Sequence, residues 1–240
     1  MTTYGLSEKV AVITGASSGI GLAVAKELHC HGMKLILTAR SEDRLYPIKN
    51  ELHATILAGD ITEPSLPRKL LDLAVSTFGR CDVVLNNAGI IEVGTIDEIN
   101  IDKVCEMVRI NVESAYRVAY TFVKYFIAQG SGHLINLSSI LGTKVRPTAG
   151  AYSGTKFAIE ALSEALRMEV AGTPVSVSCI EPGLVMTDLH RNWAVHPSEG
   201  MNIPHPLQPE DIARCVSFML SQPAHVKIPR LMVLPSEHQV

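Results

Sequence analysis

A tyrosine and a lysine near the start of a helix-like segment are placed to do acid–base chemistry together. Tyr152 and Lys156 stand four positions apart, so on a helix they share one face. An unperturbed tyrosine has a pKa of about 10, and a neighbouring ammonium group favours the phenolate and lowers that pKa. Many helices carry such a pair by chance, as a surface tyrosine packed on a lysine stem. The rest of the chain must therefore supply a cofactor and a substrate position.

A glycine-rich turn near the N-terminus is the strongest indication of a cofactor. Residues 9–14 form a short β-branched apolar run, typical of a buried strand, and residues 22–30 have apolar positions at helical spacing. Gly15, Gly19 and Gly21 lie between them, where glycines let the backbone approach a pyrophosphate and a helix N-terminus offers free N–H groups. The spacing is G-x-x-x-G-x-G rather than G-x-G-x-x-G, and no Lys-Ser/Thr pair follows as in a triphosphate-binding loop. A tight turn without a ligand is the simpler alternative.

Arg40 indicates which dinucleotide would bind. In dinucleotide-binding folds an acidic residue about 20 positions past the glycines binds the adenosine ribose hydroxyls. This chain has Ala39 and Arg40 there, with Arg44 one helical turn later. A guanidinium in place of a carboxylate suits a 2′-phosphate, so NADP(H) is favoured over NAD(H). A solvated arginine at a strand end is the alternative.

The remaining pattern alternates strands with helices, which predicts an α/β protein with a parallel sheet and right-handed crossovers. Polar residues follow several of the strands, where ligands bind in open α/β sheets: Asn87 and Gly89 after one strand, Ser138 and Ser139 after another. Asn111, inside the helical segment 102–129, is either a core amide or a site residue. The predicted strands are 9–14, 35–40, 54–59, 81–85, 132–139, 173–180 and 228–234, and the predicted helices are 22–30, 41–52, 63–78, 102–129, 153–171 and 209–221.

Composition limits the class of protein. The 240 residues carry a formal net charge of −3 with no long basic run, which argues against nucleic acid or a membrane as partner. The five cysteines are scattered without metal or disulfide spacing, and the N-terminus lacks the build of a signal peptide, so we expect a cytoplasmic protein. The irregular segment of about 188–206 is the expected substrate loop. Its His190, His196 and His205 favour solvated side chains over a metal site, and no metal is expected.

Together these residues resemble the short-chain dehydrogenase/reductase family along essentially the whole chain. Thirteen positions separate Ser139 from Tyr152, and the order and spacing of every motif fit. The resemblance implies one domain over residues 1–240: a Rossmann fold with a doubly wound, parallel seven-stranded sheet in the order 3-2-1-4-5-6-7 and helices on both faces. The matching motifs are Thr14-Gly15-Ala16-Ser17-Ser18-Gly19-Ile20-Gly21, Asp60, Asn86-Asn87-Ala88-Gly89, Asn111, Ser139, Tyr152, Lys156 and Pro182-Gly183.

The resemblance also implies the role of each residue. Tyr152 would exchange a proton with the substrate oxygen, Lys156 would lower the Tyr152 pKa and bind the nicotinamide ribose, and Ser139 would orient the carbonyl. Asn111 would complete this tetrad by holding a water linked to Lys156. One departure is that Ala16-Ser17-Ser18 lacks the basic residue with which many relatives contact a 2′-phosphate, which leaves Arg40 nearly alone. The implied cofactor-binding residues are Gly15, Ser17, Ser18, Gly19, Ile20, Gly21, Arg40, Asp60, Ile61, Asn87, Ala88, Gly89, Tyr152, Lys156, Pro182, Gly183, Val185 and Thr187.

The leading hypothesis is an NADP(H)-dependent oxidoreductase acting on a small ketone, aldehyde or 3-oxo acid, or on the corresponding alcohol. Residues 152–157 and 229–235 are similar to NADP-dependent 3-hydroxy acid dehydrogenases, a weaker resemblance. The alternatives are an NAD(H)-dependent alcohol or hydroxysteroid dehydrogenase and a non-catalytic redox sensor. Apolar surface on the helices at 102–129 and 153–171, with the resemblance, implies a homodimer or homotetramer.

Overall fold

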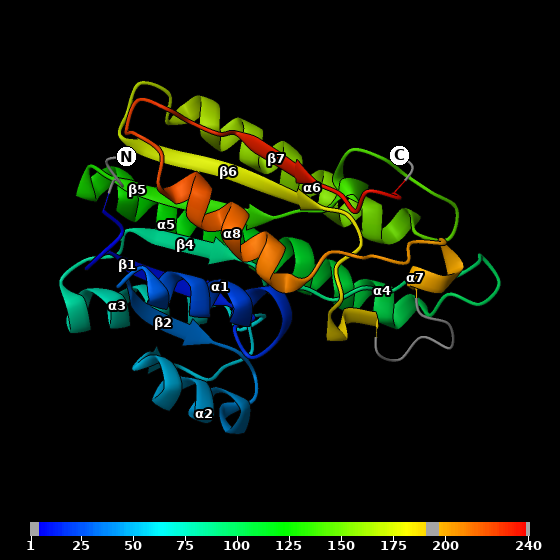
Figure 1. The fold of residues 1–240 in the computed structure, drawn as a ribbon, viewed down its shortest axis with the longest axis horizontal. Coiled ribbons are helices and arrows are strands. Elements are labelled where there is room, and N and C mark those ends of the chain that lie inside the picture. Colours follow the sequence, from blue (N-terminus) through cyan, green and yellow to red (C-terminus); the bar gives the residue numbers. More distant parts are fainter. Residues whose placement is uncertain (1–4, 191–196, 239–240) are drawn as a thin grey trace.

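A parallel sheet forms the centre of the protein (Figure 1). The computed structural model describes residues 5–190 and 197–238, and all statements below concern these residues. Seven strands pair in parallel in the order β3-β2-β1-β4-β5-β6-β7, which confirms the predicted fold class and strand order. The central strands β1 and β4 are buried throughout and mostly apolar, because helices cover both of their faces. The bounds are β1 (Val10–Thr14), β2 (Lys34–Thr38), β3 (Thr55–Ile56), β4 (Val83–Asn86), β5 (Gly132–Leu137), β6 (Val175–Pro182) and β7 (Arg230–Val233).

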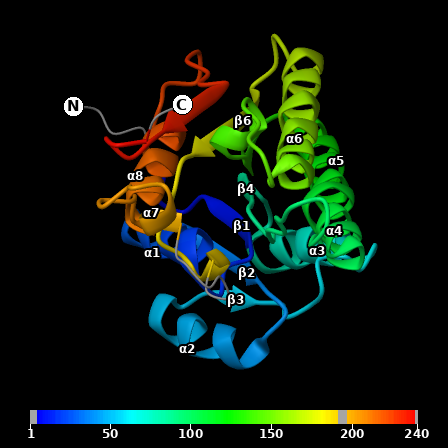
Figure 2. The same ribbon diagram turned by 90° about the vertical axis from the view of Figure 1, so that its right-hand side faces the viewer.

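Helices cover the sheet in two layers, as Figure 2 shows edge-on. One face carries α1 (Gly19–Cys30), α2 (Glu42–Leu52) and α8 (Pro209–Leu220), whose apolar sides form one core with β1 and β2. The other face carries α3 (Leu66–Phe78), α5 (Ala115–Gln129) and α6 (Gly150–Glu169), which form a second core around Phe122 and Phe126. The sheet is thus held rigidly from both sides, and its carboxyl ends remain available for a site.

The segment 102–129 is not the single helix that the sequence predicts. It consists of α4 (Ile101–Val108), a π-helical turn (Arg109–Ser114) and α5. The wide turn carries Asn111, whose Oδ1 accepts a hydrogen bond from the Ile90 N–H at 2.9 Å and whose Nδ2 donates to the Ile90 carbonyl at 2.8 Å. Hydrophobic periodicity does not reveal such a turn, because one extra residue barely changes the apolar pattern.

Two other segments differ from expectation in detail. Helix α6 begins at Gly150, three residues before the predicted start, so Tyr152 lies in its first turn. The expected substrate loop, 188–206, contains a 3₁₀ turn (Asp188–His190) and α7 (Pro197–Gly200). Residues 191–196, including Trp193 and His196, lie outside the described residues. Within the described ranges, no helix is both long and apolar enough to cross a lipid bilayer.

Candidate active site

A large cavity lies at the carboxyl ends of the strands, bordered by residues that directly follow β1, β2, β4, β5 and β6. Its volume of about 1620 Å³ exceeds the roughly 300–1,000 Å³ of common ligand pockets, so a dinucleotide and a small substrate fit together. Gly21 and Asn111 stand behind the wall, whereas the other predicted site residues line the cavity: Gly15, Ser17, Ser18, Gly19, Ile20, Arg40, Asp60, Ile61, Asn87, Ala88, Gly89, Ser139, Tyr152, Lys156, Pro182, Gly183, Val185 and Thr187.

The glycine turn is locked to the turn that follows β4. Gly15 and Gly19 adopt φ values of +66° and +53°, a conformation that favours glycine. The Thr14 hydroxyl accepts hydrogen bonds from the Asn87 and Ala88 N–H groups at 2.9 and 3.0 Å, and Asn87 Nδ2 donates to the Thr14 carbonyl at 2.8 Å. The Asn87 amide nitrogen therefore holds the turn. Thr14 was not a predicted site residue, although its place at the end of a strand beside the glycines was a usable signal.

One end of the cavity has the features of a dinucleotide phosphate site. Ser18 precedes α1 without capping it through its side chain, so the first-turn N–H groups of this helix stay available beside the cavity. Arg40 and Arg44 border the same end. Asp60 is fixed by Thr62, whose backbone N–H and hydroxyl both donate to its Oδ1 and lower the pKa of Asp60. Bare glycine backbone, a helix N-terminus and two guanidinium groups together fit an anionic dinucleotide with an additional phosphate.

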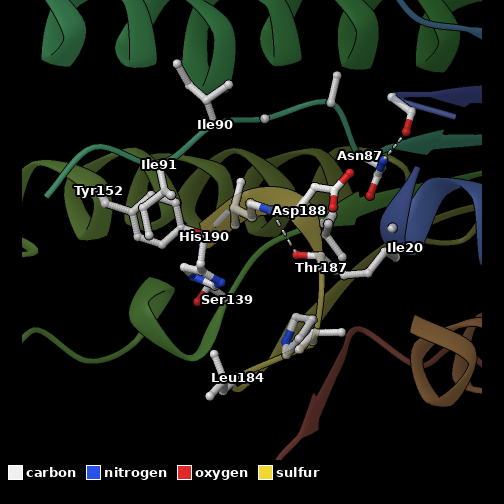
Figure 3. Close-up of a pocket in the computed structure, with 18 of the residues that line it drawn as sticks. Ile20, Asn87, Ile90, Ile91, Ser139, Tyr152, Leu184, Thr187, Asp188 and His190 are labelled. Atoms are coloured by element: carbon white, nitrogen blue, oxygen red, sulfur yellow. Dashed lines mark hydrogen bonds between the residues drawn. The ribbon is translucent and has the colours of Figure 1, made fainter. Parts of the chain in front are cut away.

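At the other end lie the predicted catalytic side chains Tyr152, Ser139 and Lys156. Figure 3 shows Tyr152 and Ser139 close together there. The Tyr152 and Lys156 side chains lie on one face of α6, with the Lys156 Nζ 5.7 Å from the centroid of the Tyr152 ring. Lys156 Nζ donates to the Leu137 carbonyl at the end of β5, at 2.8 Å. The Ser139 hydroxyl accepts from the Leu141 N–H at 3.1 Å, which fixes it where β5 ends. The residues that directly follow β5 and the first two turns of α6 thus bring the three groups together.

Burial dominates the proton affinities of this pair. Tyr152 and Lys156 are each only 7% exposed. Burial raises the pKa of Tyr152 to about 12, against the opposing effects of the Ser139 hydroxyl and the Arg146 charge. Burial lowers the pKa of Lys156 to about 8, with Cys179 and Glu160 acting in the opposite direction. The sequence led us to expect a lowered pKa for Tyr152; instead the loss of hydration on burial outweighs the groups that favour the phenolate.

Three cavity residues near this end were missed by sequence reasoning. His190, expected to be a solvated loop histidine, is partly buried and lies beside Tyr152 and Ser139 in Figure 3. Arg146 and His238 also line the cavity, the latter from the C-terminal segment after β7. Their sequence contexts, an irregular loop and a chain end, carry no periodic signal. His205 is exposed and contacts Glu237 at 3.0 Å, and the described residues contain no His, Cys, Asp or Glu cluster suited to a metal ion.

Two buried carboxylates lie behind the catalytic helix. Glu160 and Glu181 share the partly exposed Arg230, whose Nε is 3.0 Å from Glu160 Oε2 and 3.5 Å from Glu181 Oε1. Burial and the neighbouring Glu160 raise the pKa of Glu181, while Arg230 opposes that shift. This cluster ties α6 to β6 and β7 on the side away from the cavity.

The sequence and the fold both match known proteins. The family model for short chain dehydrogenases matches residues 9–197. An uncharacterized oxidoreductase of Staphylococcus aureus (strain N315) is 36% identical over 233 residues, 96% of this chain and 98% of the relative. Among solved structures, a closed form of serine dehydrogenase complexed with NADP⁺ superposes with a TM-score of 0.90 at 25% identity, over 96% of each chain. An alcohol dehydrogenase from the archaeon Thermococcus sibiricus, complexed with 5-hydroxy-NADP, has a TM-score of 0.85 at 30% identity, over 98% of this chain and 99% of that one.

The chain therefore belongs to the short-chain dehydrogenase family, as its motifs predicted. It is an oxidoreductase of that family with a Rossmann-like parallel sheet.

Proposed function

We propose that this protein is an NADP(H)-dependent oxidoreductase that transfers hydride between the nicotinamide and a small carbonyl compound or secondary alcohol. The observation that carries the proposal is that Tyr152, Ser139 and Lys156 converge in the cavity that also contains the glycine turn. A proton donor, an orienting hydroxyl and a dinucleotide site in one cavity are the components that a hydride-transfer enzyme needs.

The cofactor would be held by the residues of the phosphate end. The α1 N-terminus and the glycine turn would bind the pyrophosphate, and Arg40, with Arg44 nearby, would bind a 2′-phosphate. Two structural relatives were solved with NADP⁺ or 5-hydroxy-NADP, which supports the choice of NADP(H) over NAD(H). When bound, the reduced cofactor supplies the hydride.

The chain itself supplies the proton and orients the substrate. With a pKa of about 12, the Tyr152 phenol is protonated at neutral pH and can donate to a carbonyl oxygen that gains negative charge. The Ser139 hydroxyl, fixed by the Leu141 N–H, orients the same oxygen. Lys156 places an ammonium group beside the ring, where it stabilises the phenolate that remains after proton transfer. Asn111 acts indirectly, because both ends of its amide hold the backbone of Ile90 on the cavity wall.

Replacing the acid tests this proposal. Tyr152→Phe removes only the hydroxyl, so we expect kcat for carbonyl reduction with NADPH to fall by about 10²–10⁴-fold. NADPH affinity, measured by fluorescence titration, should change less than about threefold. Tyr46→Phe is the matched control, because Tyr46 is 56% exposed on α2 and should tolerate the loss of its hydroxyl. Retained turnover in Tyr152→Phe would refute the assigned acid, and tight NADPH binding without turnover of any ketone, aldehyde or 3-oxo acid by the natural chain would favour a redox sensor.

Self-association is part of the same proposal. Tyr120 and Ile127 on α5 and Phe157 and Met168 on α6 are exposed apolar side chains on the two helices expected to pair. Their exposure supports a homodimer or homotetramer formed through these helices. Light scattering at micromolar concentration tests this, and a monomer there contradicts it.

A further inference from the structure

Arg146 is a half-buried cation at the reaction end of the cavity. It lies in the loop between the 3₁₀ turn Ile140–Gly142 and α6, and it lines the cavity together with Tyr152. Its Nη1 contacts the Met201 sulfur at 3.0 Å, and its Nε is buried with no hydrogen-bond partner among the residues that the structure describes. A thioether is only a weak acceptor. Most of the hydrogen-bonding capacity of this guanidinium is therefore unused.

Such an arrangement is costly unless a ligand completes it. A buried N–H without a partner costs about 1–3 kcal/mol, and more when the group is charged. Elsewhere in the described chain, partly exposed arginines beside buried acids are paired: Arg80 with Asp82, and Arg230 with Glu160 and Glu181. Arg146 has no such carboxylate among the described residues. Glu237, the glutamate on the cavity wall, contacts His205 instead.

His238 adds a second unused nitrogen next to Arg146. Its ring rests on Gly183, where an added Cβ would come within 2.6 Å of His238 Nδ1. This Nδ1 is buried and has no hydrogen-bond partner in the described part of the chain. Burial lowers the pKa of His238, and the Arg146 charge lowers it further. The imidazole is therefore neutral at pH 7, and in one of its two tautomers Nδ1 carries the proton and can donate a hydrogen bond.

Arg146 and Tyr152 line the same cavity. The Arg146 charge opposes the upward effect of burial on the pKa of Tyr152. Apolar side chains, among them Ile91, Leu141 and Leu184, line this cavity as well. The expected ligand thus has an anionic group at one end, a short apolar body and a carbonyl that faces Tyr152.

We infer that Arg146, assisted by His238, binds the carboxylate of the substrate, and that the substrates are short oxo acids and their hydroxy acid counterparts rather than neutral ketones. A guanidinium offers a carboxylate two parallel N–H donors, so the contact orients the substrate as well as neutralising it. This inference rests on the proposed function, because it assumes that the carbonyl of the same molecule is reduced beside Tyr152.

The test compares acids with their neutral esters. Initial rates with NADPH are measured for 3-oxobutanoate and 4-oxopentanoate and for the methyl ester of each. For at least one of the two acids, we expect the natural chain to have a higher kcat/KM than for the corresponding ester. Arg146→Gln should lower kcat/KM for that acid by about 10- to 150-fold, which is the change expected when a hydrogen bond to a charged group is lost. The kcat/KM for the ester should change less than about threefold. Arg146→Lys should recover part of the loss, since it restores the charge without the planar donor pair.

Two controls separate a direct contact from other effects. Lys103→Gln removes a positive charge from an exposed position on α4 that does not line the cavity, and we expect less than a threefold effect on the acid. Butanoate, a non-reducible acid, should raise the melting temperature of the NADP⁺-loaded natural chain more than butanamide does, and this difference should vanish in Arg146→Gln. Failure of the natural chain to reduce any of the four compounds would count against the proposed function itself. Equal kcat/KM for acids and esters, an equal loss of both in Arg146→Gln, or an equal effect of Lys103→Gln on the acid would overturn the carboxylate site alone.

Discussion

Gly21 is the position where a single methyl group should damage the cofactor site most. A Cβ added there would lie 2.4 Å from the Gly15 carbonyl oxygen and 2.7 Å from Asn87 Nδ2. To bring the first contact to 3.0 Å, the lower limit of real Cβ contacts, the turn must move by at least 0.6 Å (3.0 minus 2.4). Neither neighbour yields easily, because Gly15 is held at φ +66° and Asn87 is bonded to the Thr14 carbonyl. Overpacking of this kind costs about 1–3 kcal/mol, and a backbone obstacle favours the upper end of that range.

The expected result for Gly21→Ala has two parts. Urea denaturation should show a loss of about 2–3 kcal/mol in the free energy of unfolding, and NADPH should bind at least about tenfold more weakly because the displaced turn no longer matches the pyrophosphate. At saturating NADPH, kcat should stay close to that of the natural chain, since Tyr152 and Ser139 are not moved.

Gly154→Ala is the matched control. Gly154 lies in α6 between Tyr152 and Lys156, and an added Cβ there meets nothing within 4 Å. In a helix interior the same change should stabilise the protein by about 0.5–1 kcal/mol and leave NADPH binding unaltered. If Gly21→Ala has the same free energy of unfolding and the same NADPH affinity as the natural chain, the close packing of the two turns does not shape the cofactor site.

Arg40→Ala should weaken the binding of NADPH by about 10- to 100-fold and that of NADH by less than threefold, because only NADPH carries the 2′-phosphate. Arg68→Ala, on the surface of α3, is the control. Equal effects on the binding of both cofactors in titrations would exclude Arg40 as the phosphate contact. Arg230→Met should lower the free energy of unfolding by about 2–3 kcal/mol, below the range for a fully buried pair because Arg230 is half exposed. The folded-state pKa of Glu181 is raised, so its contribution to stability is lost as pH rises through that pKa. Since Arg230 opposes the shift, the deficit of Arg230→Met should be larger at pH 8 than at pH 5 in urea titrations, and an equal deficit at both would refute the coupling.

The sequence contained most of the fold because the strands and helices differ in period and in residue type. The run from Val10 to Thr14 has the residues of a buried strand and leads into the glycine turn, and β2 and β4 are similarly short and rich in apolar residues. The elements that were misjudged are those without a periodic signal. The π-helical turn at Asn111 preserves the apolar pattern on both sides, and β3 is only two residues long although a six-residue strand was expected.

The dinucleotide end of the site was more predictable than the substrate end. Gly15, Arg40 and Asn87 follow strands, and the parallel topology brings the carboxyl ends of strands to one edge. Arg146 and His238 come together only through the path of an irregular loop and of the C-terminal segment. Such paths depend on tertiary packing rather than on local spacing, so no pattern in the chain marks these two residues.

The Tyr152–Lys156 pair has a different meaning in the structure than in the sequence. Spacing alone suggests a phenol made acidic by an ammonium group, whereas burial sets the Tyr152 pKa near 12 and the Lys156 pKa near 8. At pH 7 the protein therefore holds a neutral phenol beside a mainly protonated lysine. Under the proposed function that state is ready to protonate a carbonyl oxygen, while oxidation of an alcohol would first need the phenolate, which is the minor form at this pH. The positive charge of Arg146 stabilises this phenolate and so lowers the pKa of Tyr152. A substrate carboxylate bound to Arg146 would neutralise that charge and cancel this effect. Occupation of the inferred carboxylate site would thus favour the protonated form of Tyr152.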